Sequence, residues 1–262
     1  MSGATEVFGS GPSRAVALHC SLSRGSAWAP LAVRLGDILT IHAPDLPGHG
    51  AAADWSSDVA YHDQALAIVD DLAGAGPVDL LGHSMGAVLA LAFAVAHPGR
   101  VRSLILYEPV LFAAIQNGDP ATTAQLRDHM HGVEESLRRG DTHGAAKAFT
   151  SVWGGAQSWD DIPDQQQQYL ADRIHLIGAC EAMLYDDACG ILAGGALERV
   201  TVPCLLMNGD CSPPSTGAIL DALSARLPNA RRATVHGGAH MAPITRSAAV
   251  AELVRPFLEG LA

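Results

Sequence analysis

The chain has 262 residues, of which 48% are hydrophobic, 16% are charged and 5% are aromatic. This composition is typical of a globular protein with a large aliphatic core, and it excludes an intrinsically disordered chain. The net charge of −11 and the scattered positions of the basic residues argue against nucleic acid or an anionic membrane as a partner.

The chain lacks sequence signals for export, membrane insertion or disulfide bonding. Residues 1–11 have neither the basic start nor the apolar run of a signal peptide, and no apolar stretch reaches the ~18 residues that a membrane-spanning helix requires. The five cysteines are odd in number and show no CxxC spacing, so neither a disulfide framework nor a zinc site is expected. We expect a soluble, cytoplasmic protein without a membrane partner.

Short β-type runs alternate along the chain with longer Ala/Leu-rich runs of helical spacing. This alternation predicts a largely parallel sheet with helices on both faces. The predicted strands are 15–19, 38–43, 78–82, 103–107, 204–208 and 230–235. The predicted helices between them are 28–35, 62–73, 85–96 and 216–227.

The β-type signals stop after residue 111 and return at residue 198. We therefore predict a helical cap, 112–197, inserted into a core domain that consists of 1–111 and 198–262. The segments with helical patterns inside the cap are 122–139, 145–152 and 165–184.

Large side chains of the predicted cap have two interpretations. They either line an apolar acyl or aryl pocket or form the core of the cap itself, because apolar residues at helical spacing serve both purposes. These residues are Phe112, Met130, Phe149, Trp153, Trp159, Tyr169, Met183 and Tyr185.

The string GHSMG at 82–86 lies where the predicted strand 78–82 meets the predicted helix 85–96. A serine hydroxyl is a weak nucleophile and needs an exposed, sharply turned position beside a base, while glycines two residues away on either side let strand and helix approach closely. A GxSxG string alone is weak evidence, since roughly 0.2 chance matches are expected in a chain with this serine and glycine content. Its position at this junction makes Ser84 a candidate nucleophile.

Three more loops follow predicted strands, and ligand sites in open parallel sheets lie at the carboxyl ends of strands. The loop HCSLSRGSAW at 19–28 has small residues whose backbone N–H groups could face a cavity. The loop HAPDLPGHG at 42–50 forms a tight turn, and VHGGAHMAP at 235–243 places His240 in a glycine-rich loop. The sequence therefore gathers its candidate site residues at one edge of the sheet.

With these four loops in this order, the chain resembles the α/β-hydrolase superfamily of esterases, haloperoxidases and C–C hydrolases. The family usually has His-Gly-X at the position of His19-Cys20-Ser21, and the matching motifs are DLPGHG at 45–50, GHSMG at 82–86 and GAH at 238–240. The resemblance implies an α/β fold with a mostly parallel sheet, helices on both faces and the helical cap inserted after the family's sixth strand.

The same resemblance implies the roles of individual residues. Ser84 would be the nucleophile and His240 the base that takes its proton and returns it to the leaving group. The backbone N–H groups of Met85 and Ser21 would form the oxyanion hole, with Leu22 as the alternative to Ser21. Cys20 departs from the family's usual glycine, so the donor in this loop stays open between Ser21 and Leu22.

The acid of the triad has two candidate positions. In the family it usually stands three residues past a glycine after the post-cap strand, and Ser212 occupies that position here. Asp210 lies one residue past Gly209 and has the alternative role of a turn residue. Some members carry the acid at the end of the strand that follows the nucleophile helix, where Glu108 ends an apolar run. Because an unpaired buried carboxylate is costly, Glu108 is the predicted acid and Asp210 the alternative.

The predicted activity is that of a serine hydrolase acting on a carboxylic ester or similar small acyl substrate, without a metal or an organic cofactor. It would proceed through a Ser84 acyl-enzyme with a Ser-His-Glu triad. Two alternatives stay open: a C–C bond hydrolase or cofactor-free perhydrolase with the same triad, and a catalytically weak ligand-binding protein of the same fold. Serine at position 84 argues against haloalkane dehalogenase and epoxide hydrolase chemistry, for which the resemblance would require aspartate.

Overall fold

The computed structural model describes residues 4–116, 118, 120–155 and 157–261 of the chain. The strands of the described part are β1 Thr5–Phe8, β2 Ser13–Leu18, β3 Leu39–Pro44, β4 Val78–His83, β5 Val101–Tyr107, β6 Cys204–Gly209 and β7 Ala230–Val235. They form one seven-stranded sheet in the order β1-β3-β2-β4-β5-β6-β7. β1 is antiparallel to β3, and the other neighbouring pairs are parallel.

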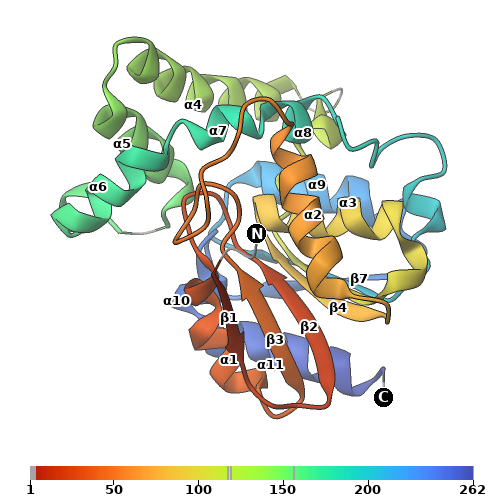
Figure 1. Ribbon diagram of the computed structural model, residues 1–262. Coiled ribbons are helices and arrows are strands. Elements are labelled where there is room, and N and C mark those ends of the chain that lie inside the picture. Colours follow the sequence, from red (N-terminus) through yellow and green to blue (C-terminus); the bar gives the residue numbers. More distant parts are fainter. Residues whose placement is uncertain (1–3, 117, 119, 156, 262) are drawn as a thin grey trace.

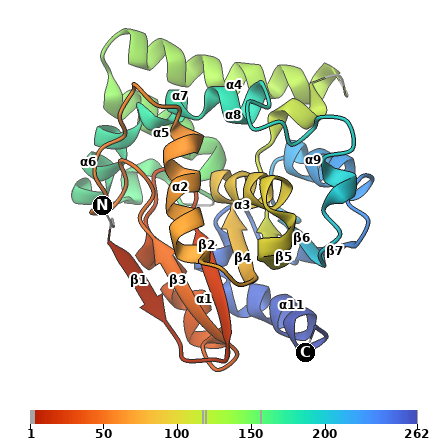
Figure 2. The ribbon, with the colours of Figure 1, turned by 45° about the vertical axis from the view of Figure 1, so that its right-hand side comes forward.

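Helices cover both faces of the sheet (Figure 2). One face packs against α2 Tyr61–Ala73, α3 Met85–Ala96 and α9 Pro214–Ser224, and the other against α1 Ala29–Leu35, α10 Ala242–Thr245 and α11 Ser247–Glu259. Successive strand residues point to opposite faces. In β5, Leu104 and Leu106 therefore join the core cluster that contains Phe93, while Ile105 joins the cluster that contains Phe257. Burial on both faces explains why the central strands are mostly apolar.

Helix α3 is buried on all sides. Its residues 85–94 are all buried, as expected for a helix that is apolar around its whole circumference. The helix begins directly after Ser84 and runs back along the sheet, so its first turn is fixed at the carboxyl end of β4.

The chain between β5 and β6 is helical and lies above the carboxyl ends of the strands (Figure 1). Its α-helices are α4 Pro120–Arg138, α5 Thr142–Trp153, α6 Asp164–Arg173, α7 Leu176–Ala179 and α8 Glu181–Tyr185. Short 3-10 helices occur in this segment and elsewhere: η1 Gly25–Trp28, η2 Pro98–Arg100, η3 Phe112–Ile115, η4 Trp159–Asp161 and η5 Leu197–Arg199. We refer to residues 112–197 as the helical segment.

The predicted fold class is confirmed, and most element boundaries agree within two residues. The predicted helical stretch 165–184 is wrong as one helix: it is divided into α6, α7 and α8. The divisions fall at the buried residues Ile174 and Cys180, where i+3 backbone hydrogen bonds close tighter turns. β1 and α11 are additional to the predicted elements. β1 is a four-residue edge strand whose two central side chains are exposed, and α11 contains Pro256, a residue that rarely occurs inside a helix.

Candidate active site

Ser84 occupies a strained turn between β4 and α3. Its backbone has φ 57° and ψ −119°, a conformation that residues other than glycine rarely adopt. A Cβ atom at Gly82 would lie 2.4 Å from the Cα of Ala87, and one at Gly86 would lie 2.2 Å from the carbonyl oxygen of Leu18. The two glycines of the motif therefore let strand, helix and neighbouring loop approach closely enough to hold this turn.

Glu108 follows β5 and pairs directly with His240. The carboxylate is fully buried, and its Oε2 accepts a hydrogen bond of 2.7 Å from His240 Nδ1. Its Oε1 accepts hydrogen bonds from the Gly209 N–H at 2.8 Å and from Ser212 Oγ at 2.5 Å. Both carboxylate oxygens are thus satisfied, which removes the penalty of a buried unpaired charge. With Nδ1 donating to Glu108, the Nε2 atom of His240 is left as the proton acceptor.

Asp210 lies away from His240. Its exposed side chain accepts hydrogen bonds from the Gly237 N–H at 2.7 Å and from His236 Nδ1 at 3.2 Å. The bond from His236 lowers the pKa of the Asp210 carboxyl. Asp210 therefore connects the loop after β6 to the loop after β7, as a turn residue does, and Ser212 contributes a donor to Glu108.

Two buried side chains hold the loop that carries His240. His83 Nε2 donates to the carbonyl oxygen of His240 at 2.7 Å, and the hydroxyl of Tyr107 donates to that of Ala239 at 2.9 Å. Burial lowers the pKa of His83 well below its usual value and raises the pKa of Tyr107, so both keep the protonation states that these bonds require. The ring of Trp153 lies edge-on to the His240 ring, with centroids 4.8 Å apart.

The candidate oxyanion donors differ in their hydrogen bonding. Met85 stands at the first position of α3, where an N–H group has no partner within the helix. Ser21 is half-buried in the loop after β2. The N–H of Leu22, the alternative donor, is already engaged, since it donates to His49 Nε2 at 3.1 Å. This geometry favours Ser21 over Leu22.

Two neutral histidines tie the loop after β2 to the loop after β3. His19 Nδ1 donates to the carbonyl oxygen of Cys20 at 2.8 Å, and its Nε2 accepts from the Leu46 N–H at 3.0 Å. His49 Nδ1 donates to the carbonyl oxygen of Pro47 at 2.9 Å. Burial lowers the pKa of His19 to about 4 and that of His49 to about 3. Each ring therefore stays neutral, with one nitrogen donating and the other accepting.

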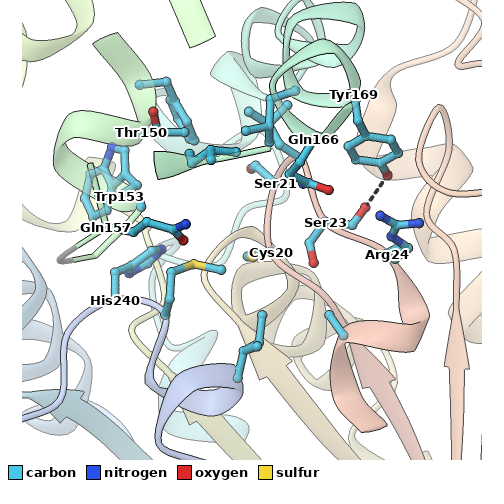
Figure 3. A pocket seen from close by; sticks show the side chains of 18 of the residues that line it. Cys20, Ser21, Ser23, Arg24, Thr150, Trp153, Gln157, Gln166, Tyr169 and His240 are labelled. Atoms are coloured by element: carbon cyan, nitrogen blue, oxygen red, sulfur yellow. Dashed lines mark hydrogen bonds between the residues drawn. The ribbon is translucent and has the colours of Figure 1, made fainter. Parts of the chain in front are cut away.

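Ser84 and His240 line one cavity of about 440 Å³ between the sheet and the helical segment. Figure 3 shows Trp153, Gln157 and His240 on one side of this cavity and Arg24 and Tyr169 on the other. The structure thus brings four predicted site residues, Ser84, His240, Glu108 and Ser21, to the carboxyl ends of the parallel strands.

A second, smaller chamber adjoins Ser84. It has a volume of about 30 Å³ and is enclosed by residues from the core and from the helical segment. The large side chains singled out in the sequence divide accordingly. Those that line the two spaces are Phe112, Met130, Phe149, Trp153, Tyr169 and Tyr185. Met183 is buried in the main core, and Trp159 packs against the core of the helical segment.

Within the described residues, no group of three or more His, Cys, Asp or Glu side chains could hold a metal ion. A search of the same residues finds no helix that is both long and apolar enough to cross a membrane.

Comparison with known proteins gives the family. The model of the alpha/beta hydrolase family matches residues 15–253. The chain belongs to the alpha/beta hydrolase family. The resemblance inferred from the sequence motifs is thereby confirmed.

Relatives of this alpha/beta hydrolase are themselves hydrolases. The pimeloyl-[acyl-carrier protein] methyl ester esterase of Xanthomonas campestris is 28% identical over 98% of both chains. Lipase LipV of Mycobacterium tuberculosis is 41% identical, but the match spans only 39% of each chain. An alpha/beta hydrolase structure from Sphaerobacter thermophilus has a TM-score of 0.72 and 25% identity, covering 97% of this chain and 95% of that one. The chain is an enzyme of the hydrolase class.

Some contacts that shape the site of this hydrolase have no signal in the sequence. Ser212 stands at the position where the family usually carries its acid, and this position was the only sequence feature that marked it. Tyr169 reaches the loop after β2 across 146 residues of chain, and Trp153 meets His240 from the helical segment. Only the folded arrangement identifies these contacts.

Proposed function

We propose that this alpha/beta hydrolase cleaves carboxylic esters through a covalent acyl-enzyme on Ser84. The observation that carries the proposal is the buried hydrogen bond of 2.7 Å between Glu108 and His240, in a site whose His240 shares a cavity with Ser84. A nucleophile, a base and an acid that orients the base are the components of a serine hydrolase triad.

The reaction proceeds in two halves. His240 Nε2 takes the proton of Ser84 Oγ as that oxygen attacks the ester carbonyl carbon, and Glu108 stabilises the resulting imidazolium. The N–H groups of Met85 and Ser21 donate to the oxyanion. When the tetrahedral intermediate collapses, the alkoxide takes the proton from His240 and leaves as an alcohol. Water then gives a proton to His240, attacks the acyl-enzyme and releases the carboxylic acid, which restores the Ser84 hydroxyl.

The relatives support an ester as the bond that is cleaved. The Xanthomonas campestris protein is named for a methyl ester, and the Mycobacterium tuberculosis protein is named a lipase. The helical segment, 112–197, serves as the cap of the core formed by 1–111 and 198–262. It supplies Phe149, Trp153 and Tyr169 to the walls of the cavity.

A fluorophosphonate probe tests the proposal, because it reacts covalently with an activated serine. The wild type should be labelled rapidly and should hydrolyse p-nitrophenyl acetate, whereas Ser84→Ala should do neither. Ser224→Ala, which removes a hydroxyl at the exposed end of α9, should be labelled like the wild type. A wild type that resists the probe would refute the proposed function.

A further inference from the structure

We infer that the smaller chamber holds the acyl group and the larger cavity holds the leaving group, so that the preferred substrate is an ester of a short-chain acid with a larger alcohol. This inference rests on the proposed function, because it concerns which side of the scissile bond each space receives. The junction between the two spaces is formed by the four residues that line both: Ser21, Ser84, Phe149 and Trp153.

The position of His240, the base, determines which way round the ester binds. In the collapse of the tetrahedral intermediate, the proton passes from the histidine to the leaving oxygen, so the leaving group must lie on the histidine's side of the carbonyl carbon. His240 lines the larger cavity, as does its neighbour Met241, and neither lines the smaller chamber. The alcohol therefore extends into the larger cavity, and the acyl substituent points into the smaller one.

The smaller chamber limits the length of the acyl group. Its volume is about 30 Å³. The larger cavity has about 440 Å³, so the chamber is by far the tighter of the two spaces and admits only a short acyl chain. The acyl groups expected to fit it are those of short acids such as acetate, propionate and butyrate.

The walls of the smaller chamber are mostly apolar and firmly packed. Val110 approaches from the core, while Phe112, Ile177 and Leu184 approach from the helical segment. All four are buried, with exposed fractions between 4% and 9%. Side chains packed from two sides leave a longer acyl chain little room to displace them, because close-packed interiors resist overpacking.

The larger cavity has the size and polarity for the alcohol. Its volume is about 440 Å³, and its walls carry the amide side chains of Gln157 and Gln166 from the helical segment. Amide N–H groups in a pocket provide hydrogen bonds to oxygen atoms of a ligand. A bulky leaving group that carries polar atoms therefore fits this space, whereas a methoxy group would leave most of it unfilled.

Two isomeric esters test directly which side of the scissile bond each space receives. Hexyl acetate and methyl heptanoate have the same composition and differ in which side of the ester carries the long chain. The wild type should hydrolyse hexyl acetate with a kcat/KM higher by on the order of tenfold or more, since each misplaced methylene costs a factor of roughly ten or above. An equal or higher kcat/KM for methyl heptanoate would overturn the inference.

Two leucines provide a matched pair of variants. Leu184 lines the smaller chamber, whereas Leu258 in α11 lines neither space, and their exposed fractions are 7% and 5%. Leu184→Ala should raise the rate on methyl heptanoate relative to hexyl acetate by on the order of tenfold, because it lengthens the acyl chamber. Leu258→Ala removes the same atoms from the core beneath the sheet and should leave this ratio near the wild-type value. An unchanged ratio for Leu184→Ala, or an equal rise for Leu258→Ala, would contradict the assignment of the smaller chamber to the acyl group.

Failure of the inference is distinguishable from failure of the proposed function. Hydrolysis of p-nitrophenyl acetate together with a preference for methyl heptanoate would overturn the direction and leave the esterase activity standing. If the wild type cleaves neither alkyl ester, p-nitrophenyl acetate and p-nitrophenyl octanoate replace them, and equal kcat/KM values overturn the inference. Absence of both hydrolysis and fluorophosphonate labelling would refute the proposed function, and the inference with it.

Discussion

At the scale of single residues, the two oxygens of Glu108 have different partners. Oε1 accepts from the Gly209 N–H and from Ser212 Oγ, while Oε2 faces His240 Nδ1. The Gly209 N–H can only donate, so the atom in front of it has to be an acceptor. This asymmetry determines how an amide would sit in place of the carboxylate.

Replacing Glu108 with glutamine should therefore impair catalysis strongly. The amide oxygen would take the Oε1 position against Gly209, and its NH₂ group would face His240 Nδ1. His240 would then have to accept at Nδ1 and carry its proton on Nε2, which is the tautomer that cannot take a proton from Ser84. We expect Glu108→Gln to lower kcat for p-nitrophenyl acetate by ~10²-fold or more, measured by steady-state kinetics.

Asp210→Asn is the matched control for this variant. It also replaces a carboxylate with an amide, and the Asn oxygen can still accept from the Gly237 N–H. Because the position is exposed and lies away from His240, its kcat should stay within about twofold of the wild type. The reverse ranking of the two variants would show that Asp210 is the acid.

At the scale of elements, helix α6 is attached to the loop that carries Ser21. The hydroxyl of Tyr169 donates to the carbonyl oxygen of Ser23 at 2.9 Å (Figure 3). It also accepts from the Gly50 N–H at 3.0 Å. The ring lies beneath the guanidinium groups of Arg24 and Arg173, at 4.7 Å and 3.8 Å from its centroid. One side chain of the helical segment thus restrains both loops at this edge of the site.

Tyr169→Phe should reduce kcat and leave KM for p-nitrophenyl acetate nearly unchanged. The variant keeps the ring and loses only the hydroxyl that fixes Ser23, two residues from the proposed oxyanion donor Ser21. A donor acts on the transition state, and a lost hydrogen bond of about 1 kcal/mol corresponds to a decrease in kcat of about fivefold. Steady-state kinetics with both parameters resolved provides the measurement.

Thr40→Val controls for the loss of a hydroxyl hydrogen bond as such. Thr40 donates to the carbonyl oxygen of Gly11 at 2.7 Å, and it lies in β3 outside both spaces of the site. This variant should lower the free energy of unfolding by about 1 kcal/mol without changing kcat. If Tyr169→Phe also changed only stability, Tyr169 would have no role in positioning the loop.

At the scale of the whole molecule, the sequence predicts the central strands of the sheet and misses the edge strand β1. Strands β4, β5 and β6 are mostly apolar runs buried on both faces, and this property is visible in the sequence. β1 escapes prediction because only two of its four residues are even partly buried. The division of 165–184 into three helices depends on tertiary packing of Ile174 and Cys180, which no local pattern encodes.

The site, too, is predicted from the sequence only where its residues lie in a recognisable local pattern. Ser84 and His240 lie in local strings with a recognisable form, and Glu108 stands out because an apolar strand ends on a carboxylate. The partners that complete the arrangement come from distant parts of the chain: Ser212 lies 104 residues from Glu108, and Tyr169 lies 146 residues from Ser23. Such contacts, and the two spaces beside Ser84, exist only after folding and therefore leave no local pattern.

Burial of neutral histidines also links the stability of the whole molecule to pH. The pKa of His19 is lowered to about 4 and that of His49 to about 3, and burial lowers the pKa of His83 in the same direction. The unfolded chain binds protons at these positions below about pH 6.5, whereas the native state does not until the pH is much lower. The stabilisation is fully present above about pH 6.5 and is lost progressively as the pH falls from there to the lowered pKa values.

We therefore expect the free energy of unfolding to fall by roughly 2 kcal/mol for each of His19 and His49 between about pH 7.5 and about pH 5. Urea denaturation at the two pH values measures the difference. In His49→Gln the amide oxygen can accept from the Leu22 N–H, yet the side chain no longer titrates, so the pH dependence should decrease by about 2 kcal/mol. A variant that loses stability on acidification as steeply as the wild type would show that His49 does not link folding to proton uptake.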